Sequence, residues 1–176
     1  MFGTELKGGP TQDEILAIDI VKLGLKKGDI FADIGCGTGK VSVAASMIAK
    51  QVFAIDRRPE AIKHARTVIR KAGVDNITFF EGEALDFLTR IEKLDCAFVG
   101  GSGELEEVLE ILAQKVSGSI VVNAVLIHTV DIAISSLKRL GIFKEALQVQ
   151  VSRSHALGEG MMFRPSEQVY IIVGGR

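Results

Sequence analysis

The sequence of 176 residues is poor in the residues that mark several functional classes: it has no tryptophan, one tyrosine and two cysteines. With so few ring systems, an extended stacking platform for nucleic-acid bases is not expected. The net charge of −1 gives no basic footprint for duplex nucleic acid either. We therefore expect no nucleic-acid partner. Cys36 and Cys96 stand at no metal-ligand spacing, so we expect free buried thiols and no metal site.

Long apolar runs are also missing. No run approaches the roughly 18 residues that a membrane span needs. The N-terminal stretch MFGTELKGGPTQDE has no apolar signal region. Apolar residues make up 47% and charged residues 24% of the chain, the balance of an ordinary globular domain. We therefore expect one cytoplasmic domain spanning residues 1–176, with one core and no membrane contact.

The chain does contain an alternation of two hydrophobic periodicities. Short runs rich in Val, Ile and Phe predict strands that are buried on both faces, at 29–35, 51–56, 76–82, 94–100 and 119–125. Helical spacing lies around them, at 12–25, 59–72, 104–115 and 129–140. In the first helix, Ile15, Ile18 and Val21 are expected on one face. This alternation predicts an α/β fold with a doubly wound, mostly parallel sheet.

The pattern changes after Gly141. Residues 143–153 and 167–175 are strand-like, and the segment between them has no clear helix. We expect an antiparallel pair that closes one edge of a seven-stranded sheet, joined by a linker of about a dozen residues.

A glycine loop, DIGCGTG, follows the first predicted strand and precedes a short helix. Gly35, Gly37 and Gly39 exceed the single glycine that a tight turn requires. The free N–H groups expected there favour an anionic group. The dinucleotide fingerprint G-x-G-x-x-G/A does not match, because Lys40 stands where a small residue is needed. P-loop spacing is absent as well.

Acidic residues stand beside the predicted strand ends. Asp56 ends the second strand, where its carboxylate can accept hydrogen bonds from both hydroxyls of a ribose, although it can also cap the helix at Pro59. Glu83 and Ala84 follow the third strand. Asp33 lies just before the glycine loop, and a buried carboxylate needs a partner, which is either a ligand ammonium or a backbone N–H.

Together, the glycine loop, Asp56 and EGEA at 81–84 resemble the class I S-adenosylmethionine-dependent methyltransferases, which have a Rossmann-like fold. The resemblance implies S-adenosylmethionine as cofactor. It also implies an adenine contact at the third strand end and an acid near the cofactor's amino group. The cofactor residues that we expect are Asp33, Gly35, Cys36, Gly37, Thr38, Gly39, Asp56, Glu83 and Ala84.

Further stretches narrow this resemblance: GGPTQDEI (8–15), FVGGSGELEEVLEIL (98–112) and ALGEGMM (156–162). With AIDRRPEAI they resemble, over nearly the whole chain, the decarboxylating cobalt-precorrin-6B C15-methyltransferases of anaerobic cobalamin synthesis. That family adds a cofactor contact at Thr11 and a homo-oligomer, specifically a tetramer. Thr11 and Glu14 also form a capping-box pattern, so a helix-capping role for Thr11 stays open.

The resemblance implies methyl transfer to C15 of a cobalt-precorrin, with loss of carbon dioxide from the C12 acetate. No catalytic residue is identifiable, because the conjugated macrocycle can supply the electrons for methylation and accept those of decarboxylation. The tetrapyrrole is large, flat and rich in carboxylates, which arginine binds well. We expect substrate contacts, or alternatively an ordinary turn and surface charges, at Gly100, Gly101, Ser102, Gly103, His128, Arg153, His155 and Arg164.

Two features of the tail need separate mention. Ser154 and His155 stand where the family pattern has a small residue after Arg153, so the substrate stage or regiochemistry could differ. Met161 and Met162 are expected in the core or in a subunit interface. Two other functions stay open: a tRNA methyltransferase, although this chain lacks an added RNA-binding part, and a non-catalytic scaffold that binds the cofactor.

Overall fold

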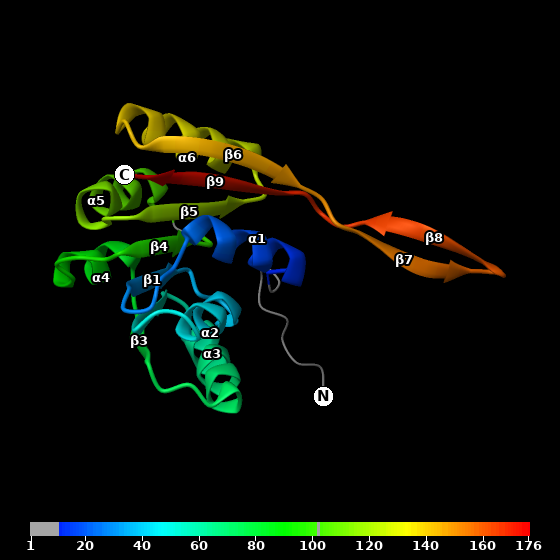
Figure 1. Ribbon diagram of the computed structural model, residues 1–176, viewed down its shortest axis with the longest axis horizontal. Coiled ribbons are helices and arrows are strands. Elements are labelled where there is room, and N and C mark those ends of the chain that lie inside the picture. Colours follow the sequence, from blue (N-terminus) through cyan, green and yellow to red (C-terminus); the bar gives the residue numbers. More distant parts are fainter. Residues whose placement is uncertain (1–10, 102) are drawn as a thin grey trace.

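The computed structural model describes residues 11–101 and 103–176, which form one seven-stranded sheet with helices on both faces and a separate two-stranded hairpin (Figure 1). The strand order is β3-β2-β1-β4-β5-β9-β6. Neighbours from β3 to β5 are parallel, and β9 is antiparallel to both β5 and β6. This confirms the predicted mostly parallel seven-stranded sheet. The sheet strands are β1 (Ile30–Ile34), β2 (Gln51–Asp56), β3 (Ile77–Glu81), β4 (Cys96–Val99), β5 (Ser119–Ala124), β6 (Phe143–Val149) and β9 (Val169–Gly175).

Six helices cover this sheet in the described part of the chain. One face carries α4 (Ala84–Arg90), α5 (Leu105–Lys115) and α6 (Ile127–Arg139), which share one large apolar core with the central strands. The other face carries α1 (Asp13–Leu23), α2 (Lys40–Ser46) and α3 (Pro59–Ala72). All four residues of β4 are buried, as expected for a strand that is covered on both sides.

The buried face of α1 differs from the predicted one. Ile15, Asp19 and Leu23 are buried at a spacing of four residues, whereas Val21 is 75% exposed. The helix is apolar on most of its surface, so apolar spacing alone could not identify the face that meets the sheet. The carboxylate of Asp19 accepts a hydrogen bond of 2.7 Å from the Asn123 side-chain amide of β5. Burial raises the pKa of Asp19 to about 7.

The predicted capping box is wrong. Helix α1 begins at Asp13 with Gln12 as its N-cap residue, and no side-chain hydrogen bond caps it. The Glu14 carboxylate instead accepts a hydrogen bond of 2.7 Å from the Arg153 guanidinium, far along the chain. Thr11 is therefore not the capping residue of this helix.

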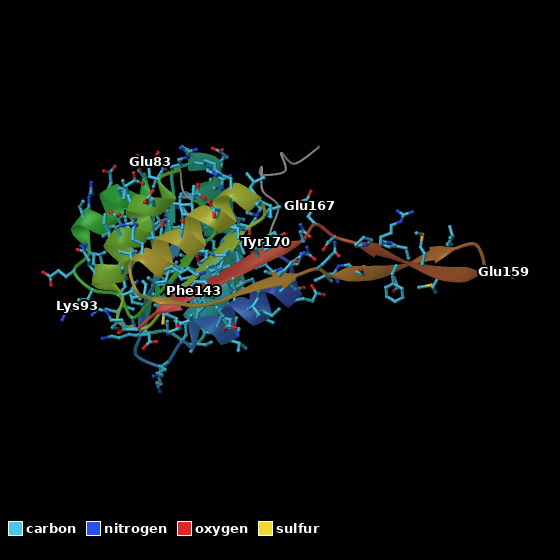
Figure 2. All side chains as sticks on the ribbon, turned by 90° about the horizontal axis from the view of Figure 1, so that it is seen from above. Glu83, Lys93, Phe143, Glu159, Glu167 and Tyr170 are labelled. Atoms are coloured by element: carbon cyan, nitrogen blue, oxygen red, sulfur yellow. The ribbon has the colours of Figure 1, made fainter. Side chains whose placement is uncertain are left out.

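The segment expected to be a linker is a hairpin, formed by β7 (Ser152–Leu157) and β8 (Gly160–Pro165). The expected strand at 143–153 correspondingly ends earlier, at Val149. Gly158 and Glu159 form a two-residue turn, and a glycine first in such a turn is a hairpin signal that the sequence reading missed. Figure 2 shows Glu159 at the tip, far from the body of the protein.

None of the helices in the described ranges is both long and apolar enough to cross a membrane.

Candidate functional site

A cavity of about 440 Å³ opens at the carboxyl ends of β1, β2, β3 and β4. The strand order reverses between β1 and β4, the place where open α/β sheets bind their ligands. The lining residues come from four loops and the start of α1. They are Thr11, Asp33, Ile34, Gly35, Cys36, Gly37, Thr38, Val41, Ile55, Asp56, Arg57, Arg58, Gly82, Glu83, Ala84, Phe98, Gly100, Gly101 and Gly103.

The N–H groups of the glycine loop point inward, not toward a ligand. Gly35 and Cys36 both donate to the carbonyl oxygen of Ile55, at 2.8 and 2.9 Å, and Gly39 donates to the carbonyl of Cys36. The N–H of Gly37 donates to Oδ2 of Asp56 at 3.0 Å. These four N–H groups are thus already used and are not the free donors that were expected for an anion. The loop suits a ligand without a phosphate at this position.

Gly35 allows two loops to touch. A Cβ atom added there would lie 2.5 Å from the backbone oxygen of Gly101, and the φ angle of +75° is one that only glycine adopts easily. The loop after β1 and the loop after β4 therefore meet at Gly35. Their contact closes one side of the cavity.

Asp33 is fully buried at the end of β1 and keeps one oxygen without a partner. Its Oδ2 accepts a hydrogen bond of 2.5 Å from the hydroxyl of Ser42, whereas Oδ1 has no partner among the described residues. Burial raises the pKa of Asp33 to about 7, although the hydrogen bonds from Ser42 stabilise the ionised carboxylate and lower the pKa. The backbone N–H of Ser42 also stabilises the ionised carboxylate, as one of the two predictions had it. This contact does not exclude a ligand ammonium as a further partner. Because Asp33 lines the cavity, a ligand ammonium would satisfy the remaining oxygen.

Asp56 is clamped by its neighbour Arg58. Oδ1 accepts from the backbone N–H and the Nε of Arg58 at 3.0 and 2.9 Å, and Oδ2 accepts from Nη2 of Arg58 at 2.9 Å. Burial raises the pKa of Asp56, but the hydrogen bonds from Arg58 and Gly37 outweigh it and hold the pKa below its ordinary value. The N-cap residue of α3 is Arg58, so the alternative of Asp56 as the N-cap is wrong.

Glu83 and Ala84 lie on the β3 side of the cavity, where they begin α4. The Glu83 carboxylate lies 3.7 Å from Nη1 of Arg57, and both side chains are more than half exposed. Sequence reasoning missed Arg57 and Arg58, although they directly follow Asp56 in the motif DRRP. Arginines that follow a strand-end acid are the signal that could have identified them.

Lys40, the residue that excluded the dinucleotide fingerprint, holds the start of α1 against this loop. Its ammonium donates to the carbonyl oxygen of Thr11 at 2.6 Å and lies 2.7 Å from the Asp13 carboxylate. The first residue of α2 thus fixes the backbone of Thr11, which lines the cavity.

The predicted substrate residues are divided between two regions. Gly100, Gly101 and Gly103 line the cavity, and Ser102 lies outside the described residues. His128 is exposed in the first turn of α6 and is not among the lining residues. Sequence reasoning also missed an exposed apolar segment just after β5, formed by Val125, Leu126 and Ile127.

The arginines of the tail lie on the hairpin. Arg153 stands opposite Arg164, and His155 stands opposite Met162, so these side chains share one face. The other face carries Met161 and Phe163, which are 66% and 69% exposed, with Ser154 and Ala156 opposite them. Met161 therefore does not lie in the core of this chain. The described lining of the cavity includes no hairpin residue.

The described lining of the cavity includes no His, Lys or Tyr, and its ionisable side chains are those of Asp33, Cys36, Asp56, Arg57, Arg58 and Glu83. Burial raises the pKa of the Cys36 thiol, so it stays neutral. Cys36 and Cys96 are both buried and free, as predicted. Within 11–101 and 103–176, no group of three or more His, Cys, Asp or Glu side chains could hold a metal ion.

Comparisons with known proteins agree with this geometry. A family model described as a precorrin methyltransferase domain matches residues 5–174. Probable cobalt-precorrin-6B C(15)-methyltransferases (decarboxylating) of Methanosarcina acetivorans and Methanosarcina mazei are 45% and 47% identical, covering 96% of this chain and 95% of each relative. The crystal structure of precorrin 8W decarboxylase from Methanobacterium thermoautotrophicum superimposes with a TM-score of 0.92 at 36% identity, over 96% of this chain and 92% of that chain.

Proposed function

This chain belongs to the precorrin methyltransferase family, together with decarboxylating cobalt-precorrin-6B C(15)-methyltransferases, and on this premise we propose that it performs their reaction. It transfers a methyl group from S-adenosylmethionine to C15 of a cobalt-precorrin and removes carbon dioxide from the C12 acetate, in cobalamin biosynthesis. The observation that carries the cofactor assignment is Asp33, which lines the cavity and whose buried Oδ1 has no hydrogen-bond partner among the described residues.

The cavity residues fit S-adenosylmethionine from one end to the other. Asp33 accepts the ammonium of the methionine part, and Asp56 accepts the two ribose hydroxyls. Glu83 and Ala84 contact the adenine beside α4. Gly35, Cys36, Gly37 and Thr38 form the wall along the middle of the cofactor, and Thr11 closes the cavity from the side of α1. Gly39, which was also predicted to contact the cofactor, is not among the lining residues and packs closely against Ala65 of α3.

When bound, the cofactor supplies an electrophilic methyl group on a sulfonium ion. The protein positions the reacting carbon at about 3 Å in line with that methyl and excludes water. The neutral Cys36 thiol cannot compete as a nucleophile for the methyl group. No protein base is needed, because the macrocycle supplies the electron pair and accepts the pair released by decarboxylation.

The surroundings of the cavity suit a flat substrate with carboxylate arms. The glycines at 100, 101 and 103 leave the β4 side of the cavity without side chains. Exposed Val125, Leu126 and Ile127, at the same edge of the sheet, offer an apolar surface for a macrocycle face. Arg57, 64% exposed beside Glu83, can bind a carboxylate at the rim. Arg153, His155, Arg164 and His128 stay candidates for contacts with the outer acid groups.

The direct test is incubation with cobalt-precorrin-6B and S-adenosylmethionine labelled in its methyl group. We expect the product to gain one labelled methyl and lose one carbon dioxide, by mass spectrometry. Methyl gain without carbon dioxide loss would contradict the decarboxylating assignment. Label in bulk tRNA would instead support the tRNA alternative. Cofactor binding with no product from either substrate would favour the non-catalytic scaffold.

Cofactor affinity is expected to fall at acid pH because of Asp33. In the ligand-free protein this carboxyl has a pKa of about 7, so it is protonated below that pH. A ligand ammonium stabilises the ionised form, and binding below pH 7 must release the proton. The affinity for S-adenosylhomocysteine should therefore drop by up to about tenfold per pH unit below pH 7 and level off above it.

Calorimetry in two buffers of different ionisation enthalpy measures this proton release. Asp33→Asn, which mimics the protonated carboxyl, should bind more weakly at pH 8 and lose most of the pH dependence. Asp19 has the same raised pKa but does not line the cavity, so Asp19→Asn is the matched control and should retain the dependence. An affinity of the unchanged protein that is constant from pH 5.5 to 8 would contradict the role of Asp33.

We expect a homo-oligomer, a tetramer, that uses the hairpin. A projecting arm with Met161 and Phe163 exposed on one face is typical of a surface that a second chain covers. Phe163→Asp should weaken association at least about tenfold, since a charge would be buried in the interface. Analytical ultracentrifugation measures the effect. His155→Asp places the same charge on the opposite face of the hairpin and should leave the face of Met161 and Phe163, and thus the association, unchanged. A monomeric unchanged protein would contradict the expectation.

A further inference from the structure

We propose that Arg58 occupies, in the ligand-free protein, the positions on Asp56 that the ribose hydroxyls of the cofactor take, so that the two compete. This inference rests on the proposed function, because it concerns how the same cavity admits S-adenosylmethionine. In this proposal Arg58 sets the affinity of the cavity for the cofactor. The sequence motifs of the glycine loop and of the strand-end acid do not predict this role.

The Asp56 carboxylate is saturated. An ionised carboxylate offers about four hydrogen-bond positions, two on each oxygen. All of them are filled, by the backbone N–H groups of Arg58 and Gly37 and by Nε and Nη2 of Arg58. The four distances lie between 2.9 and 3.0 Å. Two ribose hydroxyls can therefore bind this carboxylate only where two present donors leave.

The donors that can leave are those of the guanidinium. The backbone N–H groups are fixed by the glycine loop and by the start of α3, and the Asp56 side chain is only 3% exposed. The Arg58 side chain is 35% exposed and lines the cavity, so it can turn toward solvent. The two hydroxyls of a ribose would then replace its two side-chain donors.

The neighbourhood also offers the displaced guanidinium a second partner. Glu60, two residues further on in the first turn of α3, already attracts the Arg58 charge. A positive charge at a helix N-terminus is unfavourable by itself, and the ion pair with Asp56 stabilises the guanidinium there. Movement toward Glu60 would release the carboxylate without leaving the cation unpaired.

Arg70 provides the matched control, because it has the same charge and lies on the same helix, α3, but is exposed and does not line the cavity. We expect Arg58→Ala to bind S-adenosylhomocysteine about five to ten times more tightly than the unchanged protein, by calorimetry. The ligand-free Arg58→Ala protein should also melt a few degrees lower, by about 2–5 °C. Arg70→Ala should change the affinity less than about twofold.

A second probe tests the exchange itself. The 2′,3′-dideoxy analogue of S-adenosylhomocysteine has no hydroxyls to displace the guanidinium, so Arg58→Ala should give it no gain in affinity. If Arg58→Ala does not fold, Arg58→Ser places a preferred N-cap residue at the same position and serves in its place.

Unchanged or weaker binding of S-adenosylhomocysteine by the Arg58 variants would overturn the competition while leaving the proposed cofactor intact. An equal gain for Arg70→Ala, or for the dideoxy analogue, would overturn it in favour of a general charge effect. Failure of the unchanged protein and of every variant to bind S-adenosylhomocysteine would overturn the proposed function, and this inference with it.

Discussion

Replacing Asp56 with alanine is expected to weaken S-adenosylhomocysteine binding about 15- to 30-fold. Two hydrogen bonds between the charged carboxylate and the ribose hydroxyls contribute about 3 kcal/mol of binding free energy, and the displacement of Arg58 from the carboxylate offsets about 1–1.4 kcal/mol of it. The carboxylate is ionised and nearly fully buried, which makes both bonds strong. Calorimetry at pH 7.5 measures the dissociation constant directly.

Asp86→Ala is the control for Asp56→Ala. Asp86 lies in the first turn of α4 and is exposed, and it is not among the residues that line the cavity. Its loss changes the net charge equally and should leave the affinity within about twofold. Melting curves of both variants separate a loss of binding from a loss of folding. Near-normal binding by a folded Asp56→Ala protein would show that the ribose lies elsewhere.

Replacing Gly35 with alanine is expected to destabilise the protein by about 3 kcal/mol or more and to abolish cofactor binding. The new Cβ would lie 2.5 Å from the backbone oxygen of Gly101, at a φ of +75°. Backbone cannot give way as a flexible side chain can, so the loops after β1 and β4 must separate. That separation opens the side of the cavity that they close together.

Gly73→Ala separates the two causes of the Gly35 effect. Gly73 has nearly the same φ, +70°, but a Cβ there would meet nothing within 4 Å. Gly73→Ala should lower the free energy of unfolding by about 1–2 kcal/mol, because alanine is strained in the left-handed backbone conformation. Urea unfolding of both variants gives the difference, which reports the contact between the loops. Equal losses in the two variants would show that the close approach to Gly101 has no energetic weight.

Much of this protein could be predicted from local patterns. The buried runs gave the positions of the strands, and parallel strands bring their carboxyl ends to one edge whatever the details of packing. This geometry is why Asp33, the glycine loop, Asp56 and Glu83 lie around one cavity, as predicted.

The errors concern side chains whose partners are distant in the sequence or unmarked by periodicity. Asp19 is buried because its helix is apolar nearly all round and Asn123 of β5 provides a partner. Glu14 does not form the predicted cap, because its carboxylate accepts a hydrogen bond from Arg153, 139 residues further along the chain. The hairpin was missed because its strands, exposed on both faces, have no hydrophobic alternation of the kind that marks a half-buried strand.

The sequence by itself determined the alternation of buried strands and helices up to Gly141 and the strand-end residues that meet at one cavity, because periodicity and strand-end positions are local properties. Only the tertiary structure decided which hydrogen-bond donors are already used. Four N–H groups of the glycine loop are bound to Ile55, Cys36 and Asp56, and Arg58 and Gly37 fill the Asp56 carboxylate. A hydrogen bond depends on distance and direction in space, and neither is fixed until the strands are paired and the loops between them are closed.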